Sequence, residues 1–322
     1  MLRQICPILQ SCGCGLCGAR APWQDGGQEA MPMPDLLIDR IVTLADASGA
    51  GDVPFATLVP GLSVVRTRAP TELVHMVYAP VFCLVLQGEK QIVTGPRSVA
   101  FGRMDSLIVS LDLPALSRIT LASAAAPYVA LALELDPALL RDLAAEIPAR
   151  PPREALAFAT APADAEIAEA MARLFSLSDK PEAIPILAPL IRQEIHYWLL
   201  SSAHGAMLRD LAHADSRAAG IARAIAAIRQ DFTQTQPVAS LARLAGMSVS
   251  AFHDHFRNIT GTSPLQFQKQ LKLAAARRLI LMGELSVAST AFAVGYESPT
   301  QFSRDYSRLF GASPLKDRQL AA

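Results

Sequence analysis

Residues 248–265 have the sequence SVSAFHDHFRNITGTSPL, and residues 298–315 repeat its pattern as SPTQFSRDYSRLFGASPL. Seven positions match at a constant spacing of fifty residues: Ser248 with Ser298, Phe252 with Phe302, Phe256 with Tyr306, Gly261 with Gly311, Ser263 with Ser313, Pro264 with Pro314, and Leu265 with Leu315. Self-similarity at a fixed period is the signature of a duplicated structural unit. We therefore expect the C-terminal third of the chain to contain one small fold twice.

The first copy predicts two helices joined by a tight turn. Val238 to Ala245 has a helical pattern, and Gly246 follows it where a left-handed residue ends a helix. Ser248 then has the side chain that caps a new helix by accepting a hydrogen bond from a free backbone N–H group.

The second copy has the same signals. Its first helix is expected over Val287 to Val294, before Gly295. Ser298 is the cap of the next helix, with Pro299 at the first helical position, where proline is favoured.

The second helix of each copy has two different faces. Aromatic and aliphatic side chains fall on one face and are expected in the core, namely Phe252, Phe256 and Ile259, then Phe302, Tyr306 and Leu309. Small, polar and basic residues fall on the other, which is the character required for contacts with base edges and phosphates in a major groove. These candidate DNA-binding residues are Ser250, Ala251, His253, Asp254 and Arg257 in the first copy and Thr300, Gln301, Ser303, Arg304 and Arg308 in the second.

A long helix is expected between the two copies, over Pro264 to Met282. At 1.5 Å per residue it spans roughly 28 Å, which is close to the ~34 Å between successive major-groove faces. We expect its basic residues on or near its exposed surface: Lys269, Lys272, Arg277 and Arg278.

Charge is divided unevenly along a chain that is neutral overall, with 29 basic and 29 acidic residues among 322. From Arg217 onward there are thirteen basic residues against six acidic ones, a net charge of +7, which leaves −7 for the remainder. Such asymmetry indicates one domain that binds a polyanion and one with another task.

These motifs resemble the DNA-binding domain of the AraC/XylS family of regulators. The resemblance is carried by residues 241–248 (LARLAGMS), 261–264 (GTSP), 293–298 (AVGYES), 302–304 (FSR) and 311–314 (GASP), and it covers about a hundred residues. It implies binding to double-stranded bacterial promoter DNA and, usually, activation by contact with RNA polymerase. On the family pattern, the base-facing positions are Ser250, His253 and Asp254, then Thr300, Ser303 and Arg304.

Asp254 departs from that pattern, because the family commonly has arginine there. Phosphates repel a carboxylate unless it accepts a hydrogen bond from a cytosine amino group or pairs with Arg257. We expect either that the second copy contributes more affinity or that the first copy binds at a cytosine.

In the N-terminal half, the pattern of apolar residues is first typical of strands and then of helices, so that the predicted fold class is α+β. Strands are expected over Leu62–Arg66, Val81–Leu86, Gln91–Thr94, Ser106–Leu111, Arg118–Leu121 and Tyr128–Glu134, with turns such as Pro60-Gly61 between them. Helices are expected over Asp35–Ala47, Pro137–Ile147, Asp164–Leu177 and Pro189–Leu211. The third helix has apolar residues that either form a dimer face or pack on the strands, namely Ile167, Met171, Leu174 and Phe175.

This half resembles the cupin-like β-barrel that serves as the sensing domain of the same family, through residues 74–78 (VHMVY) and 83–88 (CLVLQG). The candidate ligand-binding residues are His75, Tyr78 and Cys83, with a redox or electrophile-sensing role for Cys83 as a further hypothesis. An enzymatic cupin needs a His-x-His pair for its metal, but His75 stands alone in its region. We therefore expect no metal, no cofactor and no enzymatic activity.

Four parts are expected along the chain: a disordered or untranslated leader at 1–32, the cupin-like sensing or dimerisation domain at 33–203, a linker at 204–215, and the tandem helix-turn-helix domain at 216–322. The leader contains four of the five cysteines, but no set of His or Cys partners follows that would complete a metal site. It also lacks the pattern of a signal peptide, and no apolar stretch is long enough to cross a membrane. A cytoplasmic location is expected.

The predicted function is sequence-specific DNA binding by a transcription regulator, expected to be an activator, whose first domain senses a small molecule. A homodimer is a possible assembly, and the effector and operator do not follow from the sequence. Two alternatives remain open: a metal-dependent cupin enzyme with an attached DNA-binding domain, and an architectural DNA-binding protein that needs no ligand. A bound metal favours the first alternative, and a strand domain without a cavity favours the second.

Overall fold

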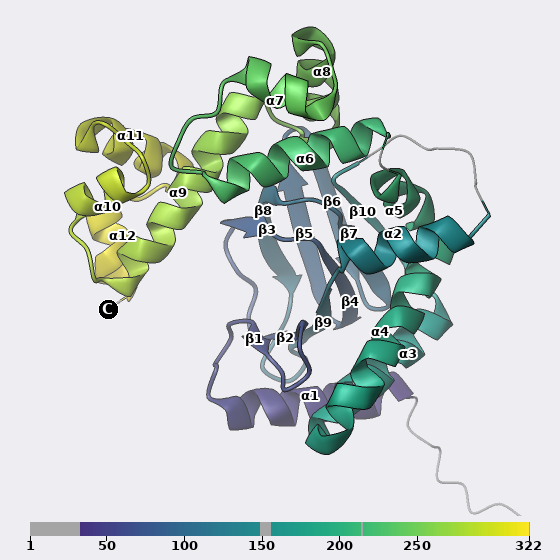
Figure 1. The fold of residues 1–322 in the computed structure, drawn as a ribbon. Coiled ribbons are helices and arrows are strands. Elements are labelled where there is room, and N and C mark those ends of the chain that lie inside the picture. The colour runs from purple at the N-terminus through teal and green to yellow at the C-terminus, as the bar shows by residue number, and fades with distance from the viewer. Residues whose placement is uncertain (1–32, 149–155, 214, 322) are drawn as a thin grey trace, which may run out of the picture. The chain divides into compact units, whose positions relative to one another are not determined.

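The computed structural model describes residues 33–148, 156–213 and 215–321. Its N-terminal half is rich in strands and its C-terminal third is helical (Figure 1). The strands are β1 Phe55–Ala56, β2 Leu62–Thr67, β3 Val74–Tyr78, β4 Val81–Gln87, β5 Glu89–Thr94, β6 Arg97–Gly102, β7 Asp105–Val109, β8 Leu113–Leu121, β9 Tyr128–Glu134 and β10 Phe158–Pro162.

The strands form two antiparallel sheets. One has six strands in the order β1-β2-β9-β4-β7-β10, and the other has four in the order β3-β8-β5-β6. Alternation along β4 shows how the larger sheet is covered, because successive side chains of a strand point to opposite faces. Phe82 and Leu84 pack with the helices, whereas Cys83 and Val85 belong to a cluster that includes residues of the smaller sheet. The six-stranded sheet is therefore covered on both faces.

Helices flank the larger sheet: α1 Met33–Ser48, α2 Pro137–Glu146, α3 Ala165–Ser176, α4 Ile184–Ser201 and α5 Gly205–Ala212, with short 3₁₀ turns at Leu177–Asp179 and Pro181–Ala183. A part-buried hydrogen bond links two of them, because Nε2 of His196 on α4 accepts from the backbone N–H of Asp136 at 3.0 Å, and Asp136 caps α2. The apolar residues of α3 named above as a possible dimer face lie in the core, where Ile167 is 1% and Leu174 0% exposed. They are therefore not available as a dimer face.

All six strands predicted from the sequence are present, but β1, β3, β6 and β10 were not predicted. The helix predicted over Pro189–Leu211 is in fact two helices, and its first half begins earlier, at Ile184. The chain turns between α4 and α5 so closely that a Cβ atom on Gly205 would lie 1.9 Å from the carbonyl oxygen of Leu200. Glycine is required at that corner because any side chain would collide with the backbone. Helix α5 occupies most of the stretch expected to be a linker.

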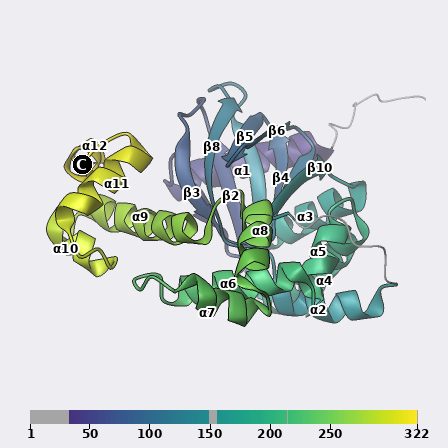
Figure 2. The ribbon, with the colours of Figure 1, turned by 90° about the horizontal axis from the view of Figure 1, so that it is seen from above.

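The C-terminal third consists of α6 Arg217–Gln230, α7 Val238–Ala245, α8 Val249–Thr260, α9 Pro264–Met282, α10 Val287–Ala293, α11 Pro299–Phe310 and α12 Pro314–Ala321. The predicted ranges of α7 and α9 agree with these bounds, and α6 and α12 were not predicted. Figure 2 shows α9 running between the α7/α8 pair and the group formed by α10, α11 and α12. The fold is thus two helix-turn-helix units joined by a long helix.

The turns of both units have the predicted chemistry. Gly246 ends α7 with φ +72°, and Gly295 follows α10 with φ +77°. At Gly295 a Cβ atom would lie 1.8 Å from the carbonyl oxygen of Thr233, so that both the left-handed conformation and the close packing require glycine.

Candidate nucleic-acid interface and sensing module

Helix α8 presents the polar face that the sequence predicts for the first unit. Ser250, His253, Asp254 and Arg257 are exposed and Ala251 is partly exposed. The opposite face is fixed in the core, where Phe252 is completely buried. The packing of that face therefore determines which side chains of α8 are available to DNA.

Helix α11 has the same arrangement in the second unit. Thr300, Gln301, Arg304 and Arg308 are exposed, and Ser303 is partly exposed. The buried face is formed by fully enclosed aromatic rings, since Phe302 and Tyr306 are both 0% exposed. A shallow hollow follows the exposed face, lined by Pro299, Thr300, Ser303, Arg304, Ser307 and Arg308.

The two recognition helices begin with capping serines. Ser248 accepts a hydrogen bond through Oγ from the backbone N–H of Ala251 at 3.3 Å, and Ser298 accepts from Gln301 at 3.4 Å. Each cap satisfies one N–H group of the first turn, and the positive end of the helix dipole favours a phosphate there. The helix ends and the exposed arginines are thus two separate features that favour an anion such as a phosphate.

Two basic residues of α9, Lys272 and Arg277, are less exposed than the sequence predicted. Lys272 is 7% exposed and donates hydrogen bonds to Thr235 Oγ1 and to the carbonyl oxygen of Gly295, both at 3.2 Å. Arg277 forms an ion pair with Asp317 of α12 at 2.8 Å. A long basic side chain can turn back to satisfy buried acceptors, so that helical position alone does not decide its exposure. Lys272 therefore links the α6–α7 connection to the second unit, and Arg277, whose side chain is 27% exposed, links α9 to α12.

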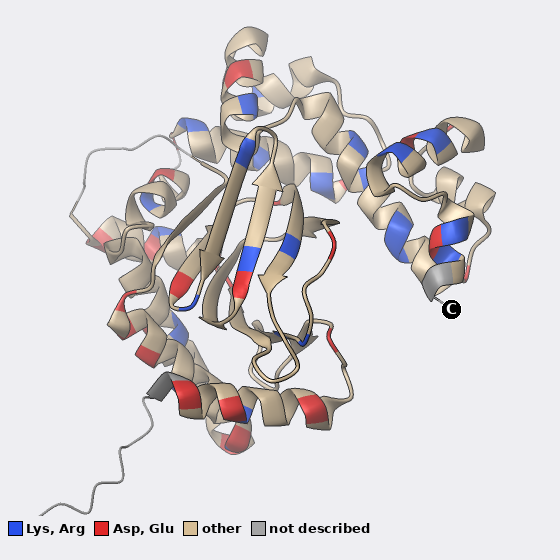
Figure 3. Cartoon of the chain, turned by 180° about the vertical axis from the view of Figure 1, so that it is seen from behind, with Lys and Arg blue, Asp and Glu red and all other residues tan. Residues whose placement is uncertain are grey.

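The acids of the C-terminal third are used in part inside it. Asp305 pairs with Lys269 at 2.7 Å, and Asp317 pairs with Arg277. Figure 3 shows lysine and arginine along the helices toward the C-terminus. Two of the six acids are therefore paired inside the domain. The exposed face of α11 presents two arginines, Arg304 and Arg308, and the other candidate residues on that face are not acidic.

Asp254 lies exposed on α8, three residues before Arg257. Within the part of the chain that the structure describes, the two form no ion pair. Pairing with Arg257 therefore does not neutralise the Asp254 carboxylate in this conformation, which leaves a cytosine amino group as its other candidate partner near DNA.

The three candidate ligand-binding residues of the first domain do not lie together. Tyr78 is buried in the cluster between the sheets, with Cys83 packed against it. His75 lies three positions earlier on β3, and odd spacing along a strand places two side chains on opposite faces. Its ring contacts Phe310 of α11 edge-on, with 5.5 Å between ring centroids. The alternation of side chains along a strand could have predicted from the sequence that His75 and Tyr78 do not share a binding site.

Between the sheets, Tyr78 and Cys83 lie with Lys90 and Tyr128, which were not among the predicted ligand-binding residues. The Lys90 ammonium lies 5.4 Å from the centroid of the Tyr78 ring, and the Tyr78 hydroxyl is buried. Burial raises the pKa of the Cys83 thiol to about 11. A thiol with such a pKa is protonated at neutral pH and reacts slowly, which argues against electrophile sensing by Cys83.

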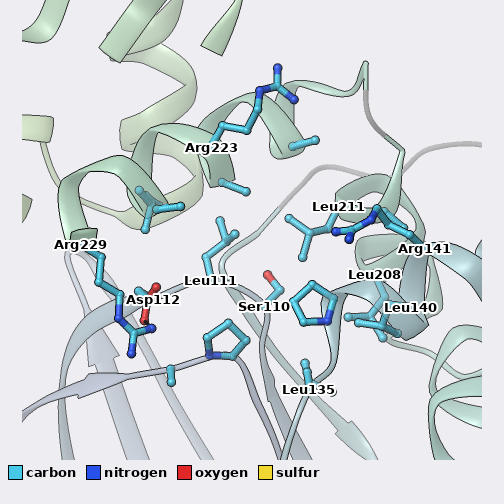
Figure 4. A pocket seen from close by; sticks show the side chains of 18 of the residues that line it. Ser110, Leu111, Asp112, Leu135, Leu140, Arg141, Leu208, Leu211, Arg223 and Arg229 are labelled. Carbon is cyan, nitrogen blue, oxygen red and sulfur yellow. Dashed lines mark hydrogen bonds and ion pairs between the residues drawn. The ribbon is translucent and has the colours of Figure 1, made fainter. Parts of the chain in front are cut away.

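A further pocket lies against α2, α5 and α6, with a volume of about 700 Å³ (Figure 4). Leu140, Leu208 and Leu211 form part of its wall, and Ser110, Leu111 and Asp112 lie at its base, between β7 and β8. The pocket was not predicted from the sequence, because the residues of its wall come from segments far apart in the chain.

Other kinds of site were also sought. Within the described ranges, no three His, Cys, Asp or Glu side chains are grouped so that they could hold a metal ion. The four cysteines of the leader lie outside those ranges. Among the helices that the structure describes, none combines the length and apolar character needed to cross a bilayer.

A strand-rich module followed by two helix-turn-helix units with exposed polar faces defines the class of DNA-binding regulators with a separate N-terminal domain. Comparison with family models agrees. Residues 58–207 match the AraC-type transcriptional regulator N-terminus, and residues 241–319 match a helix-turn-helix domain. The N-terminal match and the helix-turn-helix match together confirm the predicted resemblance to the AraC-type transcriptional regulators.

Individual relatives are more distant. The virulence regulon transcriptional activator VirF of Yersinia enterocolitica is 26% identical over 168 residues, 52% of this chain and 60% of VirF. The regulator GlxA of Rhizobium meliloti is 39% identical over 75 residues, 23% of each protein. The chain thus matches less than two thirds of the length of these relatives.

Solved structures share the fold over most of the chain. ToxT from Vibrio cholerae has a TM-score of 0.52 at 10% identity, covering 81% of this chain and 97% of ToxT. An unsaturated fatty acid bound ToxT also has a TM-score of 0.52 at 10% identity, covering 79% of this chain and 92% of ToxT. The predicted α+β fold class is confirmed by this likeness.

Proposed function

We propose that this protein is a transcription regulator that binds specific double-stranded promoter DNA and responds to a small molecule. The observation that carries the proposal is the repeated geometry of α8 and α11, each with a capped N-terminus, a buried aromatic face and an exposed polar face. The candidate DNA-binding residues are the ten exposed or partly exposed positions of these helices. Helix α9, of 19 residues, spaces the two units for adjacent major grooves.

The first domain is the proposed sensing part. Support comes from the match to an AraC-type N-terminus, and from ToxT, which has the same fold and has been crystallised with an unsaturated fatty acid. Its candidate binding regions are the cluster of Tyr78, Cys83, Lys90 and Tyr128 between the sheets and the pocket against α6. We assign His75 a structural role at Phe310 in place of the expected ligand contact.

Activation is the proposed direction of regulation, because VirF is a transcriptional activator, and RNA polymerase is the proposed partner in that step. We propose neither catalysis nor a cofactor for this chain, and we place its action in the cytoplasm. The domain limits proposed are 33–203 for sensing and 216–322 for DNA binding. A homodimer would need a surface other than the buried face of α3.

The test is selection of duplexes from a random pool by the full-length protein, followed by a salt titration on the selected site and on a scrambled duplex of equal length. The expected result is a selected consensus in two parts, with affinity that falls steeply as salt rises. A double variant, Arg304→Ala with Arg308→Ala, should lose the half contacted by α11, whereas Arg118→Ala on the exposed surface of β8 should bind as the parent does. Equal binding to selected and scrambled duplexes would contradict specificity, and absence of binding at low salt would contradict the function.

A further inference from the structure

The pocket against α2, α5 and α6 has the size of an organic ligand site. Its volume of about 700 Å³ lies within the range of roughly 300 to 1,000 Å³ found for such sites. It is lined by the β3–β4 turn, the β7–β8 turn, the end of β9 with α2, helix α5 and helix α6. We refer to it as the α6 pocket.

Apolar side chains form most of its wall. Leu111 and Leu140 come from the first domain, Leu211 comes from α5, and Ile225 comes from α6. Figure 4 shows these leucines around one hollow. Binding of an aliphatic or aromatic group against such a wall is favourable, because apolar surface of both the ligand and the pocket is then removed from water.

Three arginines line the α6 pocket, but they are not equivalent. Arg229 forms an ion pair with Asp112, whose side chain is only 11% exposed. Arg223 directs its guanidinium away from the hollow, whereas Arg141 extends from α2 toward Leu211 across it (Figure 4). Arg141 is exposed and forms no ion pair with any residue that the structure describes. Its planar group of donors suits a carboxylate.

We propose that the α6 pocket binds an organic acid with an apolar body, whose carboxylate pairs with Arg141 and whose carbon skeleton packs on the leucines and on Ile225. This assignment rests on the proposed function and specifies the chemical class of its effector. An acid is favoured over an amine because three arginines but only two carboxylates line the pocket, and one of those carboxylates, Asp112, is already neutralised by Arg229.

The position of α6 explains why occupancy matters for DNA binding. On one side, Ala222, Ile225 and other residues of α6 line the pocket. On another side α6 packs tightly on α7, since a Cβ atom on Gly220 would lie 2.6 Å from the carbonyl oxygen of Ala245. A ligand in the pocket therefore contacts a helix that packs against the first helix-turn-helix unit, which is a direct physical route for coupling the two sites.

The experiment measures binding of decanoate, 2-naphthoate and decan-1-ol to the full-length protein by titration calorimetry, with no DNA present. Decan-1-ol has the apolar chain without the charge. Arg141→Ala removes the proposed carboxylate partner, and Ala226→Trp fills the pocket from an exposed position of α6. Arg118→Ala, an exposed arginine on β8, is the matched control, and thermal unfolding followed by circular dichroism verifies that each variant is folded.

We expect at least one of the two acids to bind. Arg141→Ala should weaken that acid about tenfold and leave decan-1-ol unchanged, as for loss of one charge-assisted contact. Ala226→Trp should abolish binding, and Arg118→Ala should have no effect. The proposal is overturned if neither acid binds at ~1 mM, if Ala226→Trp binds as the parent does, or if Arg141→Ala affects the acid and the alcohol equally. Separate titration of the selected duplex reports on the DNA-binding function independently of these outcomes.

Discussion

Tyr306 of α11 donates a hydrogen bond from its hydroxyl to Oδ2 of Asp317 on α12 at 2.7 Å. The same carboxylate accepts from Nε of Arg277 on α9 at 2.8 Å, so that one acid connects three helices of the second unit. Burial alone would raise the pKa of Asp317, but the hydrogen bonds from Arg277 and Tyr306 hold it below its ordinary value of 3.8. The recognition helix α11 is thus positioned by a polar network beneath it.

Asp317→Asn should destabilise the protein by about 1 to 3 kcal/mol, because Arg277 and Tyr306 would lose a charged acceptor. The stabilisation from the ionised carboxylate is present above pH 3.8 and is lost as the pH falls through the lower pKa of the folded state. Urea unfolding at pH 7 should show the difference, and it should shrink toward pH 3. Glu284→Gln, an exposed carboxylate with no ion pair in the described residues, is the control and should change little.

His204 provides a second pH dependence, in the first domain. Its Nε2 lies 2.8 Å from Oγ of Ser106, and burial lowers the pKa of the imidazole from 6.5 to about 4. Because the folded protein binds this proton less well than the unfolded chain, stability is full above pH 6.5 and falls as the pH drops toward 4.

At pH 5 the loss attributable to His204 should be about 2 kcal/mol relative to pH 7. His204→Gln, which keeps a hydrogen-bonding side chain, should remove that part of the acid sensitivity. The measurement is denaturant unfolding at both pH values, with His253→Gln on exposed α8 as the control. Equal pH dependence in the parent and in His204→Gln would show that the imidazole is not held neutral.

Cys83 should be unreactive in the folded protein. With its pKa raised to about 11 by burial, its thiolate fraction at pH 7.5 is about one hundredth of that of an ordinary cysteine, which slows alkylation in proportion. Iodoacetamide labelling followed by mass mapping of the Cys83 peptide measures this, with the urea-unfolded protein as reference. Equal rates in both states would contradict the burial and reopen an electrophile-sensing role.

The parts of the fold that could be predicted have signals within a short stretch of sequence. The turns at Gly246 and Gly295 and the caps at Ser248 and Ser298 are local, so the two helix-turn-helix units were predicted nearly to the residue. Strand β6 was not predicted because its exposed residues give no alternating pattern.

Sites built from distant segments could not be predicted in this way. The α6 pocket joins Leu111, Leu140, Leu211 and Ile225, and no spacing in the chain relates them. The inward position of Lys90 could have been predicted in principle, since alternation along β5 places its side chain on the same face as the buried Ile92. A lysine inside a sheet is rare, and composition alone favours solvent for it.

Asp254→Asn should strengthen DNA binding several-fold at low salt, because it removes a negative charge near the phosphates from an exposed position. The gain should decrease as salt rises. Competition binding on the selected duplex measures it, with Glu284→Gln as the matched change at a distance from α8. If the variant instead loses its preference at one cytosine, the carboxylate accepts from the base and contributes specificity.

Arg304→Ala distinguishes base contact from phosphate contact on α11. Arg304 lies on the exposed face next to Ser303, in the first half of the helix, and Arg308 lies one turn later. Because the N-terminal part of a recognition helix reaches base edges, Arg304→Ala should cost about 1 to 3 kcal/mol on the selected site and relax the preference at one position. Arg308→Ala should weaken all duplexes alike and reduce the salt slope by about one. Fluorescence anisotropy on the selected site and its single-base variants measures both effects, and a uniform loss for Arg304→Ala would assign that arginine to the phosphates and leave base discrimination by α11 to Thr300 and Ser303.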